Sequence, residues 1–213
     1  ILQELSDAYE KLRLSDSRYL PDGKAQITGY YEDNKLVKIK TFTVCYQNTE
    51  ENRKSTDRKL IQIIEDICKK YDVLVEEYLI NPTGKFLIGG FLGDAGLTGR
   101  KIVVDSYQSF ANVGGGAFSG KDPTKVDRSG AYKAREIAKD ILVNNSEYEW
   151  CSVQLSYAIG IEEPLAIYIK TDKGDIEVSR ELYQECRPRN IIKDLDLRNI
   201  CYEEKARFGH FKN

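Results

Sequence analysis

Glycine and cationic residues occur together in three short segments of the chain. These segments are residues 21–24 (PDGK), 89–101 (GGFLGDAGLTGRK) and 114–128 (GGGAFSGKDPTKVDR). Glycine exposes backbone N–H groups and allows close approach to the backbone, while Lys and Arg supply positive charge. Any one segment could equally form tight turns. Three such segments within about 110 residues favour a ligand that carries phosphate or another anionic group.

The third segment partly matches a known phosphate-binding pattern. Residues 115–121 fit the first part of G-x-x-x-x-G-K, but the next residue is Asp122 instead of the Ser or Thr that would bind magnesium. The preceding stretch, residues 107–113, is interrupted by polar side chains and is a poor buried strand. A P-loop nucleoside triphosphatase is therefore a poor explanation of the pattern.

The cations of this segment are expected at the start of a helix. We predict a helix over residues 122–143, with Asp122 as its N-cap and Pro123 at its first position. Lys121 and Lys125 would then lie one turn apart at a helix end that carries partial positive charge. Asp127 is suited to bind magnesium, and it is equally suited to be a first-turn acid that interacts favourably with the helix dipole.

The elements that must position these segments are both helices and strands. Apolar residues at three-four spacing predict a second long helix over residues 53–71, and two shorter helices are predicted, from the cap Ser179 to Cys186 and over residues 188–195. The predicted strands are residues 24–31 and 35–46, which form a hairpin around residues 32–34, and residues 77–80, 85–88, 101–105, 150–159 and 164–171, with a turn at residues 172–174. This order predicts an α+β fold with helices packed on mixed or antiparallel sheets.

The composition limits the expected partners. The net charge of −2 gives no reason to expect nucleic acid or an anionic membrane as a partner, and no apolar run reaches the roughly 20 residues that span a bilayer. The first residues do not resemble a secretory signal, and their lack of Met suggests a piece of a longer polypeptide. Five widely spaced cysteines without a C-x-x-C pair predict reduced thiols in a cytoplasmic protein. The single histidine, His210, is a weak basis for nucleophilic catalysis.

Two of the segments carry a family resemblance. Residues 88–105 (IGGFLGDAGLTGRKIVVD) and 114–129 (GGGAFSGKDPTKVDRS) are similar to the two signature segments of methionine adenosyltransferases, also called S-adenosylmethionine synthetases. Further matches follow in the family's order: LPDGKAQIT at residues 20–28, INPTGKF at 80–86, QLSYAIG at 154–160, RPRNIIKDLDLRN at 187–199 and FGHF at 208–211. The resemblance covers essentially the whole chain and is very specific in the second segment.

The resemblance implies a fold, an assembly and a reaction. Family members contain three similar α+β domains of the β-α-β-β type around a pseudo-threefold axis, and this chain would hold about two of them, a central domain at residues 1–97 and a C-terminal domain at 98–213. They are homodimers or homotetramers with active sites between subunits. Methionine sulfur attacks C5′ of ATP and displaces the triphosphate, which is then cleaved to pyrophosphate and phosphate. Two magnesium ions and one potassium ion per site assist.

The resemblance also implies residue roles. The residues expected to contact ATP are Asp22, Gly23, Lys24, Lys85, Phe86, Asp94, Arg100, Lys101, Ala117 and Lys121. Among them Lys24, Arg100, Lys101 and Lys121 would act in catalysis by holding the polyphosphate, and Phe86 would stack on adenine. Asp94 and Lys125 would contact methionine, and Asp127 would bind magnesium. A thioether nucleophile has no proton to lose, so a site rich in cations and poor in histidine suits this reaction.

The chain departs from the family pattern at several positions. Lys85 stands where Arg is usual, so the charge stays but the planar guanidinium is lost. Phe91-Leu92 replaces Pro-Met, Gln108-Ser109 replaces a Gly-Gly pair, and Val113 and Asn48 replace histidines. None of these changes removes a residue assigned above.

The family's N-terminal H-P-D-K, G-E-x-x-T and G-x-G-D-Q-G segments do not occur in this sequence. We therefore expect the 213 residues alone not to complete an active site. Two other readings stay open. One is a catalytically silent relative that serves as a structural or regulatory subunit, although the many retained charges argue against it. The other is an unrelated nucleotide phosphotransferase, which would need a protein nucleophile or base that the sequence does not offer.

Overall fold

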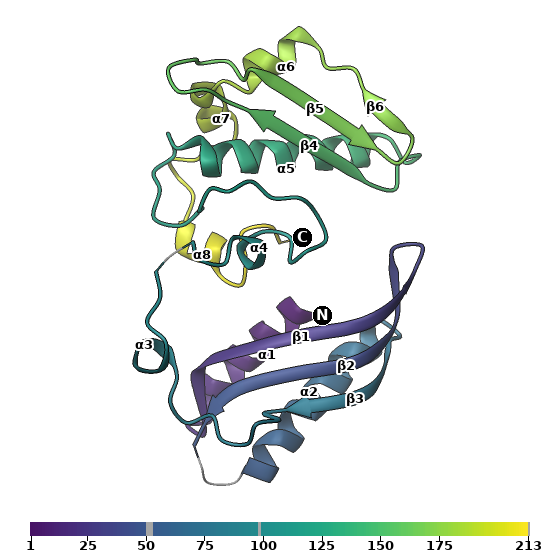
Figure 1. Ribbon diagram of the computed structural model, residues 1–213, viewed down its shortest axis with the longest axis vertical. Helices are drawn as coiled ribbons and strands as arrows, with labels where there is room; N and C mark the ends of the chain where they lie inside the picture. The colour runs from purple at the N-terminus through teal and green to yellow at the C-terminus, as the bar shows by residue number, and fades with distance from the viewer. Residues whose placement is uncertain (50–52, 98, 213) are drawn as a thin grey trace. The chain divides into compact units, whose positions relative to one another are not determined.

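A computed structural model describes residues 1–49, 53–97 and 99–212, and the chain divides into two compact units (Figure 1). The first unit is Ile1–Gly96 and the second is Leu97–Asn213. Each unit contains a three-stranded sheet, helices and hydrophobic clusters of its own. The predicted α+β class, with one mixed and one antiparallel sheet, is confirmed.

The first unit is built around a long hairpin. Its elements are α1 (Leu2–Ser15), β1 (Tyr19–Glu32), β2 (Lys35–Asn48), α2 (Arg53–Lys70), β3 (Leu74–Ile80) and the short α3 (Gly90–Gly93). Strand β2 pairs antiparallel with β1 and parallel with β3. Asp33 and Asn34 connect the hairpin with φ of 47° and 60°, the backbone that a two-residue turn between twisted strands requires. The predicted hairpin and the strand at residues 77–80 are confirmed.

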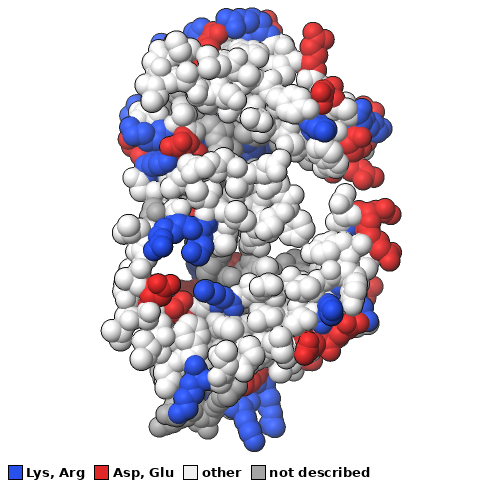
Figure 2. All heavy atoms as spheres, in the orientation of Figure 1, with Lys and Arg blue, Asp and Glu red and all other residues white. Residues whose placement is uncertain are grey.

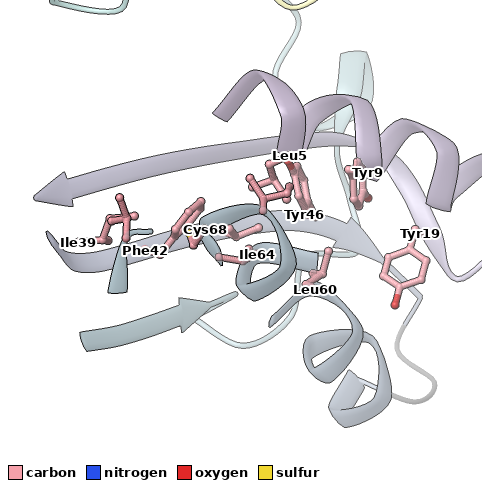
Figure 3. Packing of buried hydrophobic residues seen from close by; sticks show 12 residues of the cluster. Leu5, Tyr9, Tyr19, Ile39, Phe42, Tyr46, Leu60, Ile64 and Cys68 are labelled. Atoms are coloured by element: carbon pink, nitrogen blue, oxygen red, sulfur yellow. The ribbon is translucent and has the colours of Figure 1, made fainter. Parts of the chain in front are cut away.

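Both long helices of the first unit pack on one face of its sheet (Figure 3). Leu5 and Tyr9 of α1 and Leu60 and Ile64 of α2 point toward the alternate residues of β2 that face inward, of which Phe42 is fully buried. Strand side chains alternate between faces, whereas a helix presents one stripe, so this layer buries apolar surface from both kinds of element. The cluster fixes β1 and β2, whose ends carry residues 21–24 and 46–48.

The second unit is organised around one long helix. Its elements are α4 (Ile102–Asp105), α5 (Val126–Asn144), β4 (Cys151–Ser156), β5 (Ala166–Thr171), β6 (Gly174–Ile176), α6 (Arg180–Glu185), α7 (Pro188–Asp194) and α8 (Tyr202–Ala206). Ile137 of α5 packs on Ile167 and Ile169 of β5, while Tyr132 joins a second cluster with Ile191 and Leu197. Helix α5 therefore joins the sheet to the C-terminal segments, as Figure 1 shows.

Three sequence predictions about these elements were wrong. Residues 85–88 form no strand. They lie beside the end of β2 and are joined to it only by isolated hydrogen bonds. Residues 101–105 contain a single helical turn, although Ile102, Val103 and Val104 favour strands. Helix α5 begins at Val126 with Lys125 as N-cap, three residues later than the predicted cap and first position, because Asp122 closes a turn of its own. Helices α1 and α8 were not predicted, although Leu2, Leu5, Tyr9 and Leu12 give α1 an apolar face.

The predicted cap at Ser179 provides a test of local stability. Its hydroxyl accepts a hydrogen bond from the backbone N–H of Leu182 at 3.3 Å, and α6 begins at the next residue. We expect Ser179→Ala to lower the free energy of unfolding of the second unit by about 1 kcal/mol, because one helix N–H loses its acceptor. Urea denaturation measures the change, and Ser179→Asp, which keeps an acceptor, is the matched control. Equal midpoints for the two variants would contradict the capping role.

No helix in the described part of the chain is long and apolar enough to cross a membrane.

Candidate functional site

Asp22 anchors the start of the first signature segment within the first unit. Its Oδ2 accepts a hydrogen bond from the backbone N–H of Gly90 at 2.8 Å. Gly89 lies so close that an added Cβ would stand 2.8 Å from the Asp22 carboxylate and 2.7 Å from Gln47 Oε1. Glycine at position 89 is thus explained by close packing. The first and second glycine-rich segments therefore meet at residues 22 and 89–90.

Gly23 and Lys24 occupy β1 next to Asp22. A Cβ on Gly23 would fall 1.9 Å from the ring of Tyr46, the residue opposite it on β2, so this glycine makes room for the tyrosine. Tyr46 in turn stacks on Tyr9 with ring centroids 3.6 Å apart. Lys24 is exposed, and its amino group forms no ion pair with another described residue. Of this segment, Lys24 is the residue available to an external anion.

Residues 85–94 run past the end of β2 without joining the sheet. The backbone N–H of Asn48 donates to the carbonyl of Phe86 at 3.0 Å, and the Gln47 amide donates to the carbonyl of Leu87 at 2.8 Å. Lys85 is exposed and Phe86 is half-buried. Asp94 ends α3, where its N–H donates to the carbonyl of Gly90 at 3.0 Å, and its side chain is exposed.

Two signature segments meet within the second unit. Gly99 has φ of 79°, and a Cβ there would stand 2.2 Å from the Cβ of Ala117. A Cβ on Gly116 would likewise stand 2.4 Å from the Cβ of Asp127. These two glycines allow the backbone of residues 114–117 to lie against residue 99 on one side and against the first turn of α5 on the other. Parts of the second and third glycine-rich segments therefore lie together here.

Lys121 and Asp127 form the central ion pair of this arrangement. Lys121 Nζ lies 2.5 Å from Asp127 Oδ2, and the Lys121 side chain is three-quarters buried while that of Asp127 is half exposed. Asp127 also lies in the first turn of α5, so the helix dipole stabilises its negative charge. Solvent reaches the pair on the Asp127 side and screens it, so its contribution to folding stability is small. A bound ligand can replace this ion pair, because an anion can bind Lys121 and a cation can bind Asp127.

Asp122 and Lys125 belong to a turn before α5. Asp122 Oδ1 accepts hydrogen bonds from the N–H of Thr124 at 2.8 Å and from its hydroxyl. These bonds, the hydroxyl first, lower the pKa of Asp122 to about 2. Lys125 Nζ lies 3.5 Å from Asp122 Oδ2 and is exposed. The lysines at positions 121 and 125 therefore precede the helix instead of lying one turn apart on it.

Arg100 and Lys101 are both exposed, and neither forms an ion pair with another described residue. Lys101 is the residue before α4 and accepts the N–H of Asp105 on its carbonyl at 2.9 Å. Gly99 contacts Ala117, so the two residues that follow it, Arg100 and Lys101, belong to a stretch of backbone next to the 114–121 segment. The second unit thus gathers Arg100, Lys101, Ala117, Lys121, Lys125 and Asp127, whereas Asp22, Gly23, Lys24, Lys85, Phe86 and Asp94 lie in the first unit.

The described residues contain no cluster of three His, Cys, Asp or Glu side chains that could hold a metal ion. On the face in Figure 2, Lys and Arg are interspersed with Asp and Glu, without a broad surface of one sign among the described residues. Asp127 is therefore a single carboxylate in a cationic neighbourhood. Such a donor set suits a cation that arrives bound to phosphate oxygens, and it does not suit a metal site made by the described residues alone.

Sequence reasoning missed the buried network around His210. The His210 ring bonds to the hydroxyl of Tyr132 through Nδ1 and to that of Ser119 through Nε2, the latter at 3.1 Å. Burial first, and then the positive charges of Arg128, Lys205 and Lys212, lower the pKa of His210 to about 4. The FGHF match at residues 208–211 was the one available signal, but a lone histidine near the chain end does not reveal its partners.

The second unit contains a cavity of about 300 Å³ next to His210. It is lined by Tyr132, Arg135, Lys139, Lys205, His210 and neighbouring residues of α5 and the C-terminal segments. None of the residues predicted to bind ATP, methionine or magnesium lines it. The candidate site is accordingly the open surface formed by residues 99–101, 114–121 and 125–127.

Two models of one protein family match consecutive parts of the chain. The family model for the central domain of S-adenosylmethionine synthetase matches residues 1–86, and the model for its C-terminal domain matches residues 88–213. The chain belongs to the S-adenosylmethionine synthetase family. Among curated relatives, the S-adenosylmethionine synthase of Clostridium tetani is 45% identical over 90% of this chain and 51% of its own length. That of Nitratiruptor sp. is 46% identical over 99% of this chain and 56% of its own length, and that of Helicobacter pylori is 46% identical over 90% and 52%.

The chain spans about half the length of these curated relatives. The two family models meet at residues 86–88, whereas the compact units meet at residues 96–97. Residues 88–96, which open the family's C-terminal domain, pack on the first unit through Asp22 and Gly90.

Proposed function

We propose that this chain supplies the central and C-terminal parts of an enzyme that forms S-adenosylmethionine from ATP and L-methionine. Family membership supports the proposal, and the observation that carries it is the packing of Gly99 on Ala117 together with the contacts of Gly116 and Lys121 with Asp127 in the second unit. The chain covers about half of its relatives, so the activity is assigned to a polypeptide that includes this chain, and the 213 residues alone are expected to be inactive.

The proposed reaction needs charge stabilisation more than proton transfer. A bond forms between the methionine sulfur and C5′ of ATP while the C5′–O bond breaks, and its electron pair leaves with the triphosphate. The sulfur becomes a sulfonium without losing a proton, so no general base is required. Lys121, Arg100 and Lys101 would stabilise the negative charge that develops on the leaving triphosphate, and family resemblance assigns the same role to Lys24.

The remaining contacts divide between nucleotide and methionine. Asp22, Gly23, Lys85, Phe86, Asp94 and Ala117 would contact ATP, with the half-buried ring of Phe86 as the surface for adenine. Asp22 and Gly23 also have the packing roles described above, so they would help ATP to bind by fixing the position of the backbone around them. Lys125 would pair with the methionine carboxylate, and Asp94 would contact both substrates.

Asp127 would hold magnesium together with the phosphate oxygens of ATP. Magnesium is commonly bound in this way, by one or two carboxylates plus substrate phosphates, and it would neutralise charge on the triphosphate. The ion pair with Lys121 keeps the carboxylate close to the cations that face the polyphosphate. A second magnesium ion, a potassium ion, a homodimer or homotetramer with shared sites and a cytoplasmic location complete the proposal by family resemblance.

The proposal is tested by product formation and by binding. With ATP, methionine, Mg²⁺ and K⁺, we expect the complete gene product to form S-adenosylmethionine, detected by mass spectrometry, and the 213-residue chain to form none. We expect the 213-residue chain to bind magnesium tripolyphosphate in calorimetry. Absence of both product and binding would contradict the enzyme and favour the silent subunit. Turnover by the 213-residue chain would contradict the need for further segments.

A further inference from the structure

The C-terminal tail holds the segment that follows Lys101. The backbone N–H of His210 donates to the carbonyl of Asp105 at 2.7 Å, and a Cβ added to Gly209, whose φ is 103°, would stand 3.4 Å from the carbonyl oxygen of Val104. Phe211 stacks on Tyr107 with ring centroids 4.8 Å apart. Residues 209–211 are therefore attached to α4 and the turn after it by both backbone and side chains.

The His210 ring connects this tail to the second signature segment. Its side chain is 1% exposed, and both ring nitrogens have partners, Tyr132 on α5 and Ser119 in the 114–121 segment. A neutral imidazole has one donor and one acceptor, and either tautomer satisfies two hydroxyl partners. The ring of Phe118 packs edge-on against His210 and Phe211, with centroids 5.1 and 5.4 Å away. Loss of a hydrogen bond in this apolar setting would leave an unsatisfied polar group.

Ser119 lies two residues before Lys121. Only Gly120 separates them, and its φ of 79° turns the chain sharply. On the other side of Ser119, the buried Arg128 donates from Nη1 to the carbonyl of Phe118 at 3.4 Å. Residues 118 and 119 are thus held by groups from α5 and from the tail, and they lie in the chain between two residues that contact Asp127, Gly116 and Lys121.

We propose that His210 is a positioning residue, which fixes Ser119 and thereby keeps Lys121 beside Asp127 in the geometry that receives polyphosphate. The choice of polyphosphate as the ligand rests on the proposed function. The ordering of residues 114–121 by His210 does not depend on it. No group on His210 touches the proposed substrate, and its effect passes through the Ser119 hydroxyl. Removal of that contact should loosen the 114–121 segment while the fold of the unit persists.

Two amide substitutions separate the two contacts of the ring. A Gln side chain can place a polar atom near the position of Nε2, whereas an Asn side chain can place one near that of Nδ1. We therefore expect His210→Gln to keep the Ser119 contact and His210→Asn to keep only the Tyr132 contact. Hydrogen exchange at the amides of residues 114–121, followed by NMR, should increase about tenfold in His210→Asn and in Ser119→Ala, and remain near wild type in His210→Gln.

Calorimetry with magnesium tripolyphosphate gives the functional readout. Binding should weaken about tenfold in His210→Asn and in Ser119→Ala, with no further loss when the two changes are combined, because they remove the same contact. Equal exchange rates and affinities for wild type, His210→Asn and His210→Gln would overturn the inference. So would an equal loss in both histidine variants with matching falls in thermal stability, since that result marks a merely structural role. If wild type itself does not bind, the proposed polyphosphate site fails, and the exchange data still decide whether His210 orders the segment.

Discussion

Replacement of Asp127 by Asn is expected to reduce S-adenosylmethionine formation by the complete gene product by about 100-fold or more. Asn has the same shape but no charge, so it weakens the magnesium contact and leaves Lys121 without its partner at 2.5 Å. The side chain is half exposed, and the fold should tolerate the change, with a thermal midpoint close to that of wild type. Initial rates measured over a range of Mg²⁺ concentrations should show a shift of the magnesium requirement to higher concentrations.

The matched control for this variant is Asp140→Asn. Asp140 lies on the same helix α5, 13 residues after Asp127, and lines the cavity instead of the candidate site. It should retain the wild-type rate and the wild-type magnesium requirement. If Asp127→Asn and Asp140→Asn have equal activities, Asp127 is only the first-turn acid that the sequence also allowed.

Acidification from pH 6.5 to pH 4 is expected to destabilise the second unit by up to about 3 kcal/mol through His210. In the folded state its pKa is lowered from 6.5 to about 4 by burial and by Arg128, Lys205 and Lys212. The unfolded chain therefore binds a proton to this residue at a higher pH than the folded chain does. The stabilisation is fully present above pH 6.5 and is lost as the pH falls through the folded value. Each unit of difference between the folded and unfolded pKa corresponds to about 1.4 kcal/mol.

His210 is the only histidine, which makes this experiment unusually direct. Urea denaturation at pH 7, 6, 5 and 4.5 gives the free energy of unfolding, and a single imidazole signal in the NMR spectrum gives the folded pKa. His210→Gln cannot titrate and should lose much less stability over the same range. A folded pKa near 6.5, or an equal pH dependence in wild type and variant, would contradict the buried neutral imidazole.

Periodicity predicted most of the fold where burial was one-sided. The hairpin at residues 24–46, the helix that begins at Arg53 and the capped helix after Ser179 each carry a local signal that burial reinforces. The strand predicted at residues 101–105 was wrong because tertiary contacts override local preference, and the carbonyl of Asp105 accepts its hydrogen bond from His210 of the tail. The start of α5 was misplaced because Asp122 satisfies Thr124 in a turn, a use of Asp that resembles a helix cap in sequence.

For the candidate site, the sequence indicated which residue types take part, but it did not indicate which residues they contact in space. The glycines at positions 99 and 116 were read as possible phosphate contacts, and the structure shows that each allows two chain segments to pack. The same is true of Gly23, where Tyr46 occupies the space of a side chain. Ser119 and His210 are 91 residues apart in sequence, and no local pattern announces their contact. Long-range pairings of this kind become visible only when the fold is known.

The position of residues 87–96 has a practical consequence for dissecting the chain. These residues follow β3 and pack on the hairpin ends through Gln47, Asp22 and Gly90, although the family's C-terminal domain begins at residue 88. If a protease or a split gene divides the polypeptide near residue 87, the first half loses residues 88–96, which pack on the ends of its hairpin. The second half then begins with these residues, which include apolar side chains and have lost their contacts with the hairpin. Division after Gly96 would leave each half with its own contacts, and it is the better junction for segmental isotope labelling or for reassembly from two expressed halves.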